Sequence, residues 1–174
     1  DDISAGKITK VRVVDTRDDN SYDKSDCEFR IKGWFDITSP AINDVYFVGK
    51  EQSITWTTFG TMPTVKLEYS LDNFSSVITP IDLAIPGVTG TNVYSWIVPD
   101  DITPDDRVRV RVTTKQPDDP EINDVSVGFK IRADIQVLSP DGGERWISNE
   151  FHDITWVISG TVNLVNIYVS TDSF

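Results

Sequence analysis

Carboxylate side chains are most concentrated in residues 15–26, and a second acidic stretch occupies residues 117–124. Oxygen ligands at short spacing between two strands suit Ca2+, which takes about 6 to 8 oxygens. Asp18, Asp19 and Asp23 are therefore the candidate calcium ligands. The spacing is not that of an EF-hand, and a solvated hairpin loop explains the same residues. Both interpretations stay open.

The residues that most enzymes use for catalysis are scarce in this chain. His152 is the only histidine and Cys27 the only cysteine, so a clustered zinc site cannot be built and any histidine-based triad would depend on His152 alone. We therefore expect that the protein is not an enzyme. Cys27 shares the inward parity of Phe29 and Ile31, which predicts a buried structural thiol rather than a reactive or lipidated one.

Basic side chains alternate with valines in two predicted strands that we expect to be neighbours. These basic side chains would then lie on the outer face of a sheet. Attraction between this basic face and acidic loops would orient copies of the protein during assembly. Cross-strand pairing with Glu68 is the alternative explanation. The residues of this candidate interface are Arg107, Arg109, Arg111, Lys130 and Arg132.

Two further surface features come from single residues. Trp34 has Asp134 as its counterpart one hundred residues later, which predicts an exposed or interdomain position and makes it a candidate interface residue. Asn73 begins the sequence Asn73-Phe74-Ser75, a formal N-glycosylation site in a predicted turn. Glycosylation would matter there only in a secreted protein.

The elements that must position these residues are predicted to be short β-strands. Val108, Val110 and Val112 alternate with arginines, the period of a strand with one buried face, and no stretch has helical spacing. Such strands, separated by turns, predict an all-β fold of antiparallel immunoglobulin-like β-sandwiches. The expected strands of one unit are 35–38, 45–48, 52–58, 64–70, 76–79, 92–98, 106–114 and 125–132.

The chain repeats itself with a period of one hundred residues. Ser53-Ile54-Thr55-Trp56 recurs as Asp153-Ile154-Thr155-Trp156, and residues 29–74 align with 129–174 without a gap. We expect Trp56, Trp156 and Trp96 to be core residues. The other identical positions are Phe29/Phe129, Ile31/Ile131, Ser39/Ser139, Pro40/Pro140, Gly60/Gly160, Thr61/Thr161, Val65/Val165, Ser70/Ser170, Asp72/Asp172 and Phe74/Phe174.

The repeat predicts three parts. Residues 35–134 form one complete sandwich, and residues 135–174 the first strands of a following unit. Residues 1–34 are the last strands of a preceding unit, because Lys10-Val11-Arg12-Val13 matches residues 109–112 and residues 26–31 match 126–131. A half sandwich exposes apolar faces and free edges. Either the array continues beyond this sequence, or another chain supplies the missing strands.

Composition limits the partners. The net charge of −12 over 174 residues argues against nucleic acid, whose phosphates require clustered Lys and Arg. No apolar run approaches the ~18 residues of a membrane-spanning helix. We therefore expect no membrane span in this segment.

An ordered set of motifs resembles a known family of surface repeats. The motifs are residues 139–146 (Ser-Pro-Asp-Gly-Gly-Glu-Arg-Trp), 154–156 (Ile-Thr-Trp), 65–72 (Val-Lys-Leu-Glu-Tyr-Ser-Leu-Asp), 94–99 (Tyr-Ser-Trp-Ile-Val-Pro), 108–112 (Val-Arg-Val-Arg-Val) and 129–131 (Phe-Lys-Ile). This set is similar to the immunoglobulin-like repeats of the fungal cell-wall family described as Ser-Thr-rich and GPI-anchored, and to repeats of large prokaryotic surface and S-layer proteins. The chain is not Ser-Thr-rich and has no GPI-type tail, which favours a prokaryotic source. The resemblance implies no catalytic residues.

The expected function is that of a structural repeat module in a large secreted or cell-surface protein. It would form a spacer, a surface fibre or an S-layer-type lattice by self-association, with copies of itself, neighbouring repeats and Ca2+ as partners. One alternative is an adhesin or carbohydrate-binding module that binds surface glycan, for which Trp34 and Tyr168 are the candidate aromatics. The other is an accessory repeat of a secreted multidomain enzyme.

Overall fold

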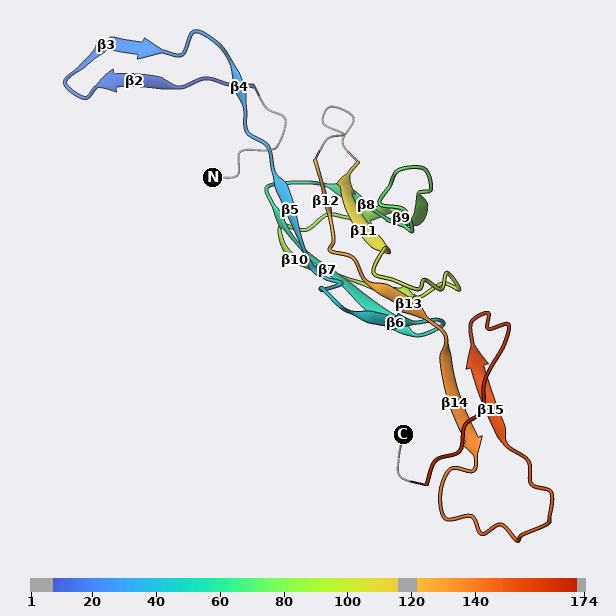
Figure 1. Ribbon diagram of the computed structural model, residues 1–174. Coiled ribbons are helices and arrows are strands. Elements are labelled where there is room, and N and C mark those ends of the chain that lie inside the picture. The colour runs from blue at the N-terminus through green and yellow to red at the C-terminus, as the bar shows by residue number, and fades with distance from the viewer. Residues whose placement is uncertain (1–7, 116–121, 172–174) are drawn as a thin grey trace.

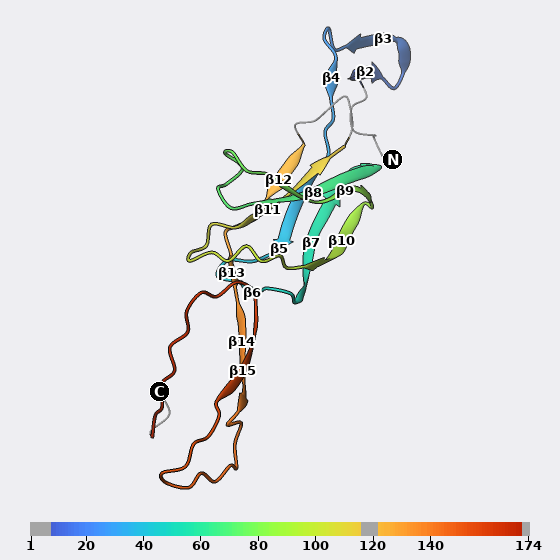
Figure 2. The ribbon, with the colours of Figure 1, turned by 90° about the vertical axis from the view of Figure 1, so that its right-hand side faces the viewer.

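A computed structural model describes residues 8–115 and 122–171, and it is all-β. Figure 1 shows three parts that follow one another in space: a group of N-terminal strands, a central two-layer unit, and a C-terminal strand pair. After a quarter turn the order is the same, so the molecule is elongated (Figure 2). Within the described ranges there is no helix long and apolar enough to cross a membrane.

The central unit is a β-sandwich of two antiparallel sheets with the orders β10-β7-β5 and β12-β11-β8-β9. A parallel pair, β13 with β6, lies beside them. The bounds are β5 (Trp34–Ser39), β6 (Val45–Phe47), β7 (Glu51–Phe59), β8 (Thr64–Ser70), β9 (Thr79–Pro86), β10 (Gly90–Ile97), β11 (Arg109–Thr114), β12 (Asn123–Val125) and β13 (Lys130–Arg132). The predicted all-β sandwich is therefore confirmed.

The core lies between these two sheets. Trp56 on β7, Leu67 on β8 and Val110 and Val112 on β11 are fully buried, because alternate side chains of a strand point to the same face. Burying one such side chain contributes about 1.5–3 kcal/mol. In the described part of the chain, every buried hydrophobic side chain lies within residues 35–131. The sandwich thus holds the molecule's packed core.

Two strands of the sandwich differ from the sequence-based expectation. The strand expected at 76–79 begins only at Thr79, as β9 (Thr79–Pro86). The Asp72 carboxylate accepts hydrogen bonds from the backbone amides of residues 75–77 and keeps these residues in a turn. The strand expected at 125–132 is divided into β12 and β13. At Gly128 a Cβ would lie 2.0 Å from the carbonyl oxygen of Asp106. Glycine lets the chain cross closely there from one sheet to the next.

The N-terminal strands form two small antiparallel pairs, β1 (Ile8–Thr9) with β4 (Phe29–Arg30) and β2 (Arg12–Asp15) with β3 (Asp18–Lys24). Their backbone pattern matches that of residues 108–129. Ser25 exchanges hydrogen bonds with Val11 as Ser126 does with Val110, and Thr9 pairs with Phe29 as Val108 does with Phe129.

This comparison corrects two sequence-based expectations. Ser25, rather than Asp26, occupies the place of Ser126, so one extra residue lies between Ser25 and Phe29. Cys27 is exposed, not buried, because no second layer from the described part of the chain packs on the N-terminal strands. Residues 117–124 are the expected counterpart of the acidic hairpin. Of these, residues 117–121 lie outside the described part of the chain.

The C-terminal strand pair repeats the geometry of β5 and β7. β14 (Asp134–Ser139) pairs with β15 (Thr155–Ser159) in a register that places Val137 opposite Trp156, with a bulge before Ser139. β5 and β7 have the same register and the same bulge one hundred residues earlier. Both Ser-Pro bonds, at 39–40 and 139–140, are cis. Backbone angles with positive φ also recur at matching places, at Gly60/Gly160, Asn43/Gly143 and Gly49/Asn149.

A small polar joint connects the sandwich to the C-terminal pair. The Asp100 carboxylate accepts hydrogen bonds from the backbone N–H of Thr161 at 2.9 Å and from its hydroxyl at 2.5 Å. Lys50 pairs with Asp134 at 2.9 Å. Gly160, at φ 102°, lies against Val48. Sequence reasoning missed this joint, because its contacts link loops that are far apart in the chain.

Candidate functional site

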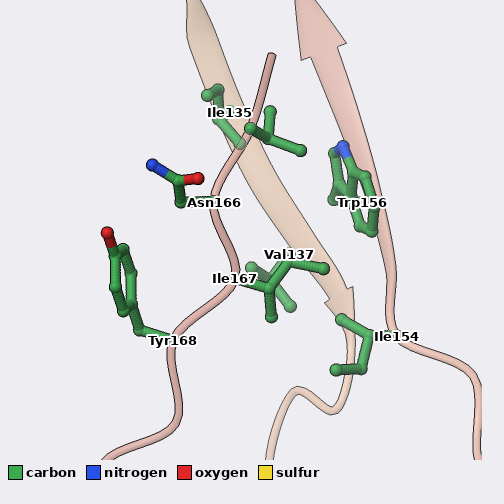
Figure 3. A pocket seen from close by; sticks show the side chains of 8 residues that line it. Ile135, Val137, Ile154, Trp156, Asn166, Ile167 and Tyr168 are labelled. Atoms are coloured by element: carbon green, nitrogen blue, oxygen red, sulfur yellow. The ribbon is translucent and has the colours of Figure 1, made fainter.

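One candidate site among the described residues is an uncovered apolar face on the C-terminal part. β14 and β15 contribute Ile135, Val137 and Trp156, and the segment that follows contributes Ile167 and Tyr168 (Figure 3). Together they border a hollow of about 400 Å3. The remaining lining residues are Ile154, Val165 and Asn166. The chemistry of this face is that of a hydrophobic contact surface, because the Tyr168 phenol is its only ionisable group.

The residues at the matching positions of the central sandwich are buried, because a second sheet covers them there. Trp56 is 1% exposed, whereas Trp156 is 36% exposed. Leu67 is 0% exposed, whereas Ile167 is 55% exposed. In the sandwich, β11 and its neighbours lie across from β7 and close the core. The C-terminal part therefore carries the inner face of a sandwich sheet, and within the described residues no strand covers it as β11 covers β7 in the central unit.

The N-terminal part presents the complementary apolar face. Val13 is 70% exposed, whereas its counterpart Val112 is 0% exposed. Val11 and Phe29 are exposed as well, although Val110 and Phe129 at the matching places are buried. Both ends of the molecule thus expose groups that the middle buries.

The predicted basic interface divides into separate ion pairs. Arg111 lies directly opposite Glu68, and its Nε and Nη2 donate to Glu68 Oε2 at 3.2 and 2.8 Å. Lys66 binds Glu68 Oε1 at 3.1 Å, and the Arg111 guanidinium lies 4.2 Å from the centre of the Phe74 ring. Burial raises the pKa of Glu68, but the bonds from Arg111 and Lys66 outweigh burial and leave this pKa below its ordinary value. Arg111 is therefore engaged within its own sheet, as the cross-strand alternative predicted.

The other basic residues do not form one outer face. Arg107 binds Asp105 at 2.7 Å, Arg109 donates to the backbone oxygen of Ser126, and Lys130 pairs with Asp106 at 3.3 Å. Lys130 and Arg132 belong to β13, in a different sheet from β11. The expectation that all five share the outer face of two neighbouring strands is wrong, because the chain changes sheet at Gly128. A role for them in assembly stays a prediction.

The predicted calcium ligands lie on an exposed hairpin. Asp18, Asp19 and Asp23 are all on β3 and exposed, and Asp18 accepts a hydrogen bond from the backbone N–H of Asn20. In residues 8–115 and 122–171, no three acidic, histidine or cysteine side chains are placed to hold a metal ion. Calcium binding in this loop stays a prediction.

The remaining candidate residues are accessible. Trp34 is 53% exposed, and its ring stacks on Phe59 with centroids 4.0 Å apart and planes within 3°. The stack was not predicted, because the pairing of β5 with β7 is what places these two residues side by side. Tyr168 is exposed on the C-terminal part. Asn73 is exposed in its turn at φ 58°.

No model of a known protein family matches this chain, and no curated protein matches it.

Proposed function

We propose that the chain is part of a tandem array of immunoglobulin-like β-sandwiches in a large secreted or cell-surface protein, where it acts as a structural spacer and lattice-forming unit. Residues 35–134 are one complete unit of this array. Residues 1–34 and 135–174 are parts of the units on either side.

The observation that carries this proposal is the recurrence of one bulged strand pair. Ile37 lies opposite Trp56 with a bulge before Ser39, and one hundred residues later Val137 lies opposite Trp156 with a bulge before Ser139. Two strand pairs with the same register are what a repeated unit produces.

Shape and chemistry support the same function. The parts follow one another along the long direction of the molecule (Figures 1 and 2), as a spacer requires. The joint of Asp100 with Thr161 and of Lys50 with Asp134 limits bending between two parts. The apolar faces offer burial rather than acid or base chemistry, which favours a structural role over an enzymatic one. The motif set of the sequence favours a prokaryotic surface protein.

The test is the state of the full-length protein on cells. Electron microscopy of the native surface should show ordered two-dimensional or fibrous arrays, and antibodies against residues 35–134 should label intact cells. A full-length protein that is strictly monomeric, or that is found only inside the cell, would refute the proposal.

A glycan-binding function is the second candidate, and the Trp34–Phe59 stack favours it. A flat aromatic surface that is half exposed can stack on the apolar face of a sugar ring. Trp34→Ala should then abolish binding in a glycan array. Trp146→Ala is the matched control, because Trp146 is a similarly exposed tryptophan that stacks on His152 in another part of the chain. The accessory-repeat alternative would require a catalytic domain in the full-length gene.

A further inference from the structure

We propose that strand β10 of the central sandwich pairs, edge to edge, with β10 of a second copy of this chain. This inference rests on the proposed array of sandwich units and names a contact by which its units associate side by side. β10 (Gly90–Ile97) lies within the complete unit, residues 35–134. The contact therefore does not depend on the parts that flank this unit.

Each sheet of the sandwich has two edge strands, β10 and β5 in one sheet and β12 and β9 in the other. The free edge of such a strand carries N–H and C=O groups with which another chain can pair. Among the described strands β10 pairs with β7 alone, and Figure 2 shows it at the margin of the central unit. Its second edge is therefore open to a partner.

The other three edge strands carry features that hinder pairing with another chain. In β9, Pro80 and Pro86 lack a backbone N–H, and the register shifts along the strand. β12 is three residues long and carries Asp124. The carboxylate of Asp124 accepts a hydrogen bond from the Ile37 backbone N–H of β5 at 2.8 Å, and β5 is bulged before Ser39.

β10 has none of these features. It pairs with β7 over its eight residues without a register shift, and it contains no proline. Residues 83–99 contain no Asp, Glu, Lys or Arg, although 25% of the whole chain is charged. An uncharged edge can lie beside its own copy without like charges facing each other, and it offers no charge that would select a different partner. A second copy of this chain is therefore the partner that β10 fits.

Alternate residues of β10 direct their backbone groups to the free edge. The Val98 N–H donates to the carbonyl oxygen of Lys50, and the Val98 carbonyl accepts from the Gly49 N–H, so the groups of Val98 point to the β7 side. This direction alternates along an antiparallel strand. The backbone groups that point away from β7 are therefore those of Thr91, Val93, Ser95 and Ile97, whose side chains are exposed.

These groups all find partners when two copies run antiparallel about a two-fold axis at Tyr94. Val93 of one copy then lies opposite Ser95 of the other, and Thr91 lies opposite Ile97. The two Tyr94 side chains, which pack against the core of their own sandwich, meet at the axis, where an aromatic cross-strand pair is favourable. Such a contact is isologous and closes as a dimer. Repeated along an array, it joins two arrays side by side in opposite directions.

The test places like charges opposite each other across the contact. In a chain with both Val93→Lys and Ser95→Lys, each new lysine faces a lysine of the second copy, which should weaken dimerisation by at least about tenfold. A chain with Val93→Glu and Ser95→Glu should be weakened for the same reason. Thr38→Lys with Ser53→Lys is the matched control, because both residues are exposed in the same sheet but on β5 and β7. Circular dichroism should show the same thermal transition in all these chains, because every replaced side chain is exposed.

Sedimentation equilibrium measures the dissociation constant of the dimer. The unmodified chain and the control should dimerise equally, and the lysine and glutamate variants should each dimerise more weakly. An equimolar mixture of the two variants should form a mixed dimer, since each lysine then lies opposite a glutamate. An unmodified chain that stays monomeric, a lysine variant that associates as tightly as the control, or a mixture that gains no mixed dimer would overturn the inference.

Cross-linking tests the register. In a Cys27→Ser background, a Val93→Cys chain mixed with a Ser95→Cys chain should form disulfides faster than either chain alone, because directly opposite residues are closer than diagonal neighbours. Equal rates would refute the register.

These experiments separate this contact from the proposed function, which is tested by the location and arrays of the full-length protein on cells. Ordered surface arrays, found together with a lysine variant that associates as the control does, would overturn the β10 contact and leave the proposed function standing.

Discussion

Replacing Arg111 with methionine tests whether this arginine serves the sandwich itself or an outer interface. The change keeps the aliphatic stem and removes both hydrogen bonds to Glu68 Oε2. The Glu68 side chain is 9% exposed, so its carboxylate would remain in a poorly solvated place with Lys66 alone. The sandwich should therefore lose stability in the single molecule, before any assembly.

The size of this loss follows from the burial of the pair. Removing one partner of a buried ion pair costs about 3–5 kcal/mol. The Arg111 side chain is 21% exposed and Lys66 still binds Oε1, so we expect about 2–3 kcal/mol. For a domain of about 100 residues this lowers Tm by about 10–20 °C.

The pH dependence provides a second check. Because the folded-state pKa of Glu68 lies below its ordinary value, the pair contributes its stability above the ordinary pKa of a glutamate, about 4.3. That contribution is lost as the pH falls through the lower folded-state pKa. The stability gap between the unmodified protein and Arg111→Met should therefore be full at neutral pH and narrow in acid.

Urea denaturation followed by near-UV circular dichroism measures both effects. Adding Glu68→Leu to Arg111→Met should restore most of the stability, since it removes the stranded carboxylate. Arg107→Met is the control, because Arg107 pairs with Asp105 in solvent, and its transition should not move. An Arg111→Met protein that is as stable as this control would refute the reasoning. Arg111 would then be assigned to the candidate interface and not to the stability of the sandwich.

Three further predictions concern other parts of the chain. Trp56→Ala should destabilise the sandwich by about 3–5 kcal/mol, whereas Trp156→Ala should leave the same urea transition unchanged; equal losses would contradict the assigned core. Asp100→Ala removes both bonds to Thr161 and should broaden the particle dimensions measured by small-angle X-ray scattering, with Asp105→Ala as a control that keeps them. If the hairpin of Asp18, Asp19 and Asp23 binds calcium, EDTA should lower Tm, and an unchanged transition would remove that prediction.

Sequence periodicity predicted most of the strands of the sandwich, because the alternation of apolar and polar residues within one strand indicates which of its faces is buried. The strand at 64–70 matches β8, and the strand at 52–58 lies within β7 (Glu51–Phe59). Alternation could not reveal that the strand at 125–132 divides at Gly128. That break depends on the close approach of Asp106, which is distant in the chain. Residues 76–79 were misplaced for a similar reason, since the Asp72 carboxylate holds the turn before β9.

The candidate surfaces were predicted to different extents. Alignment of the two copies indicated that residues 135–174 are half of a sandwich, and hence that an apolar face would be exposed. Cys27 followed the same alternation and was still placed wrongly. A strand's periodicity indicates which side chains share a face, but burial requires a second layer. Around Cys27 that layer is absent from the described part of the chain.

Local pattern and internal repetition were enough to specify an all-β chain and the period of one hundred residues, because these depend on neighbouring residues and on turn chemistry. The pairing of Arg111 with Glu68, the joint of Asp100 with Thr161 and the stack of Trp34 on Phe59 depended on the folded arrangement. Each joins residues from different strands or loops, and their separation in space is set only when the sheets form and pack. The exposure of Trp156 beside the burial of Trp56 has the same cause: the same Ile-Thr-Trp sequence has a covering layer in one place and, among the described residues, none in the other.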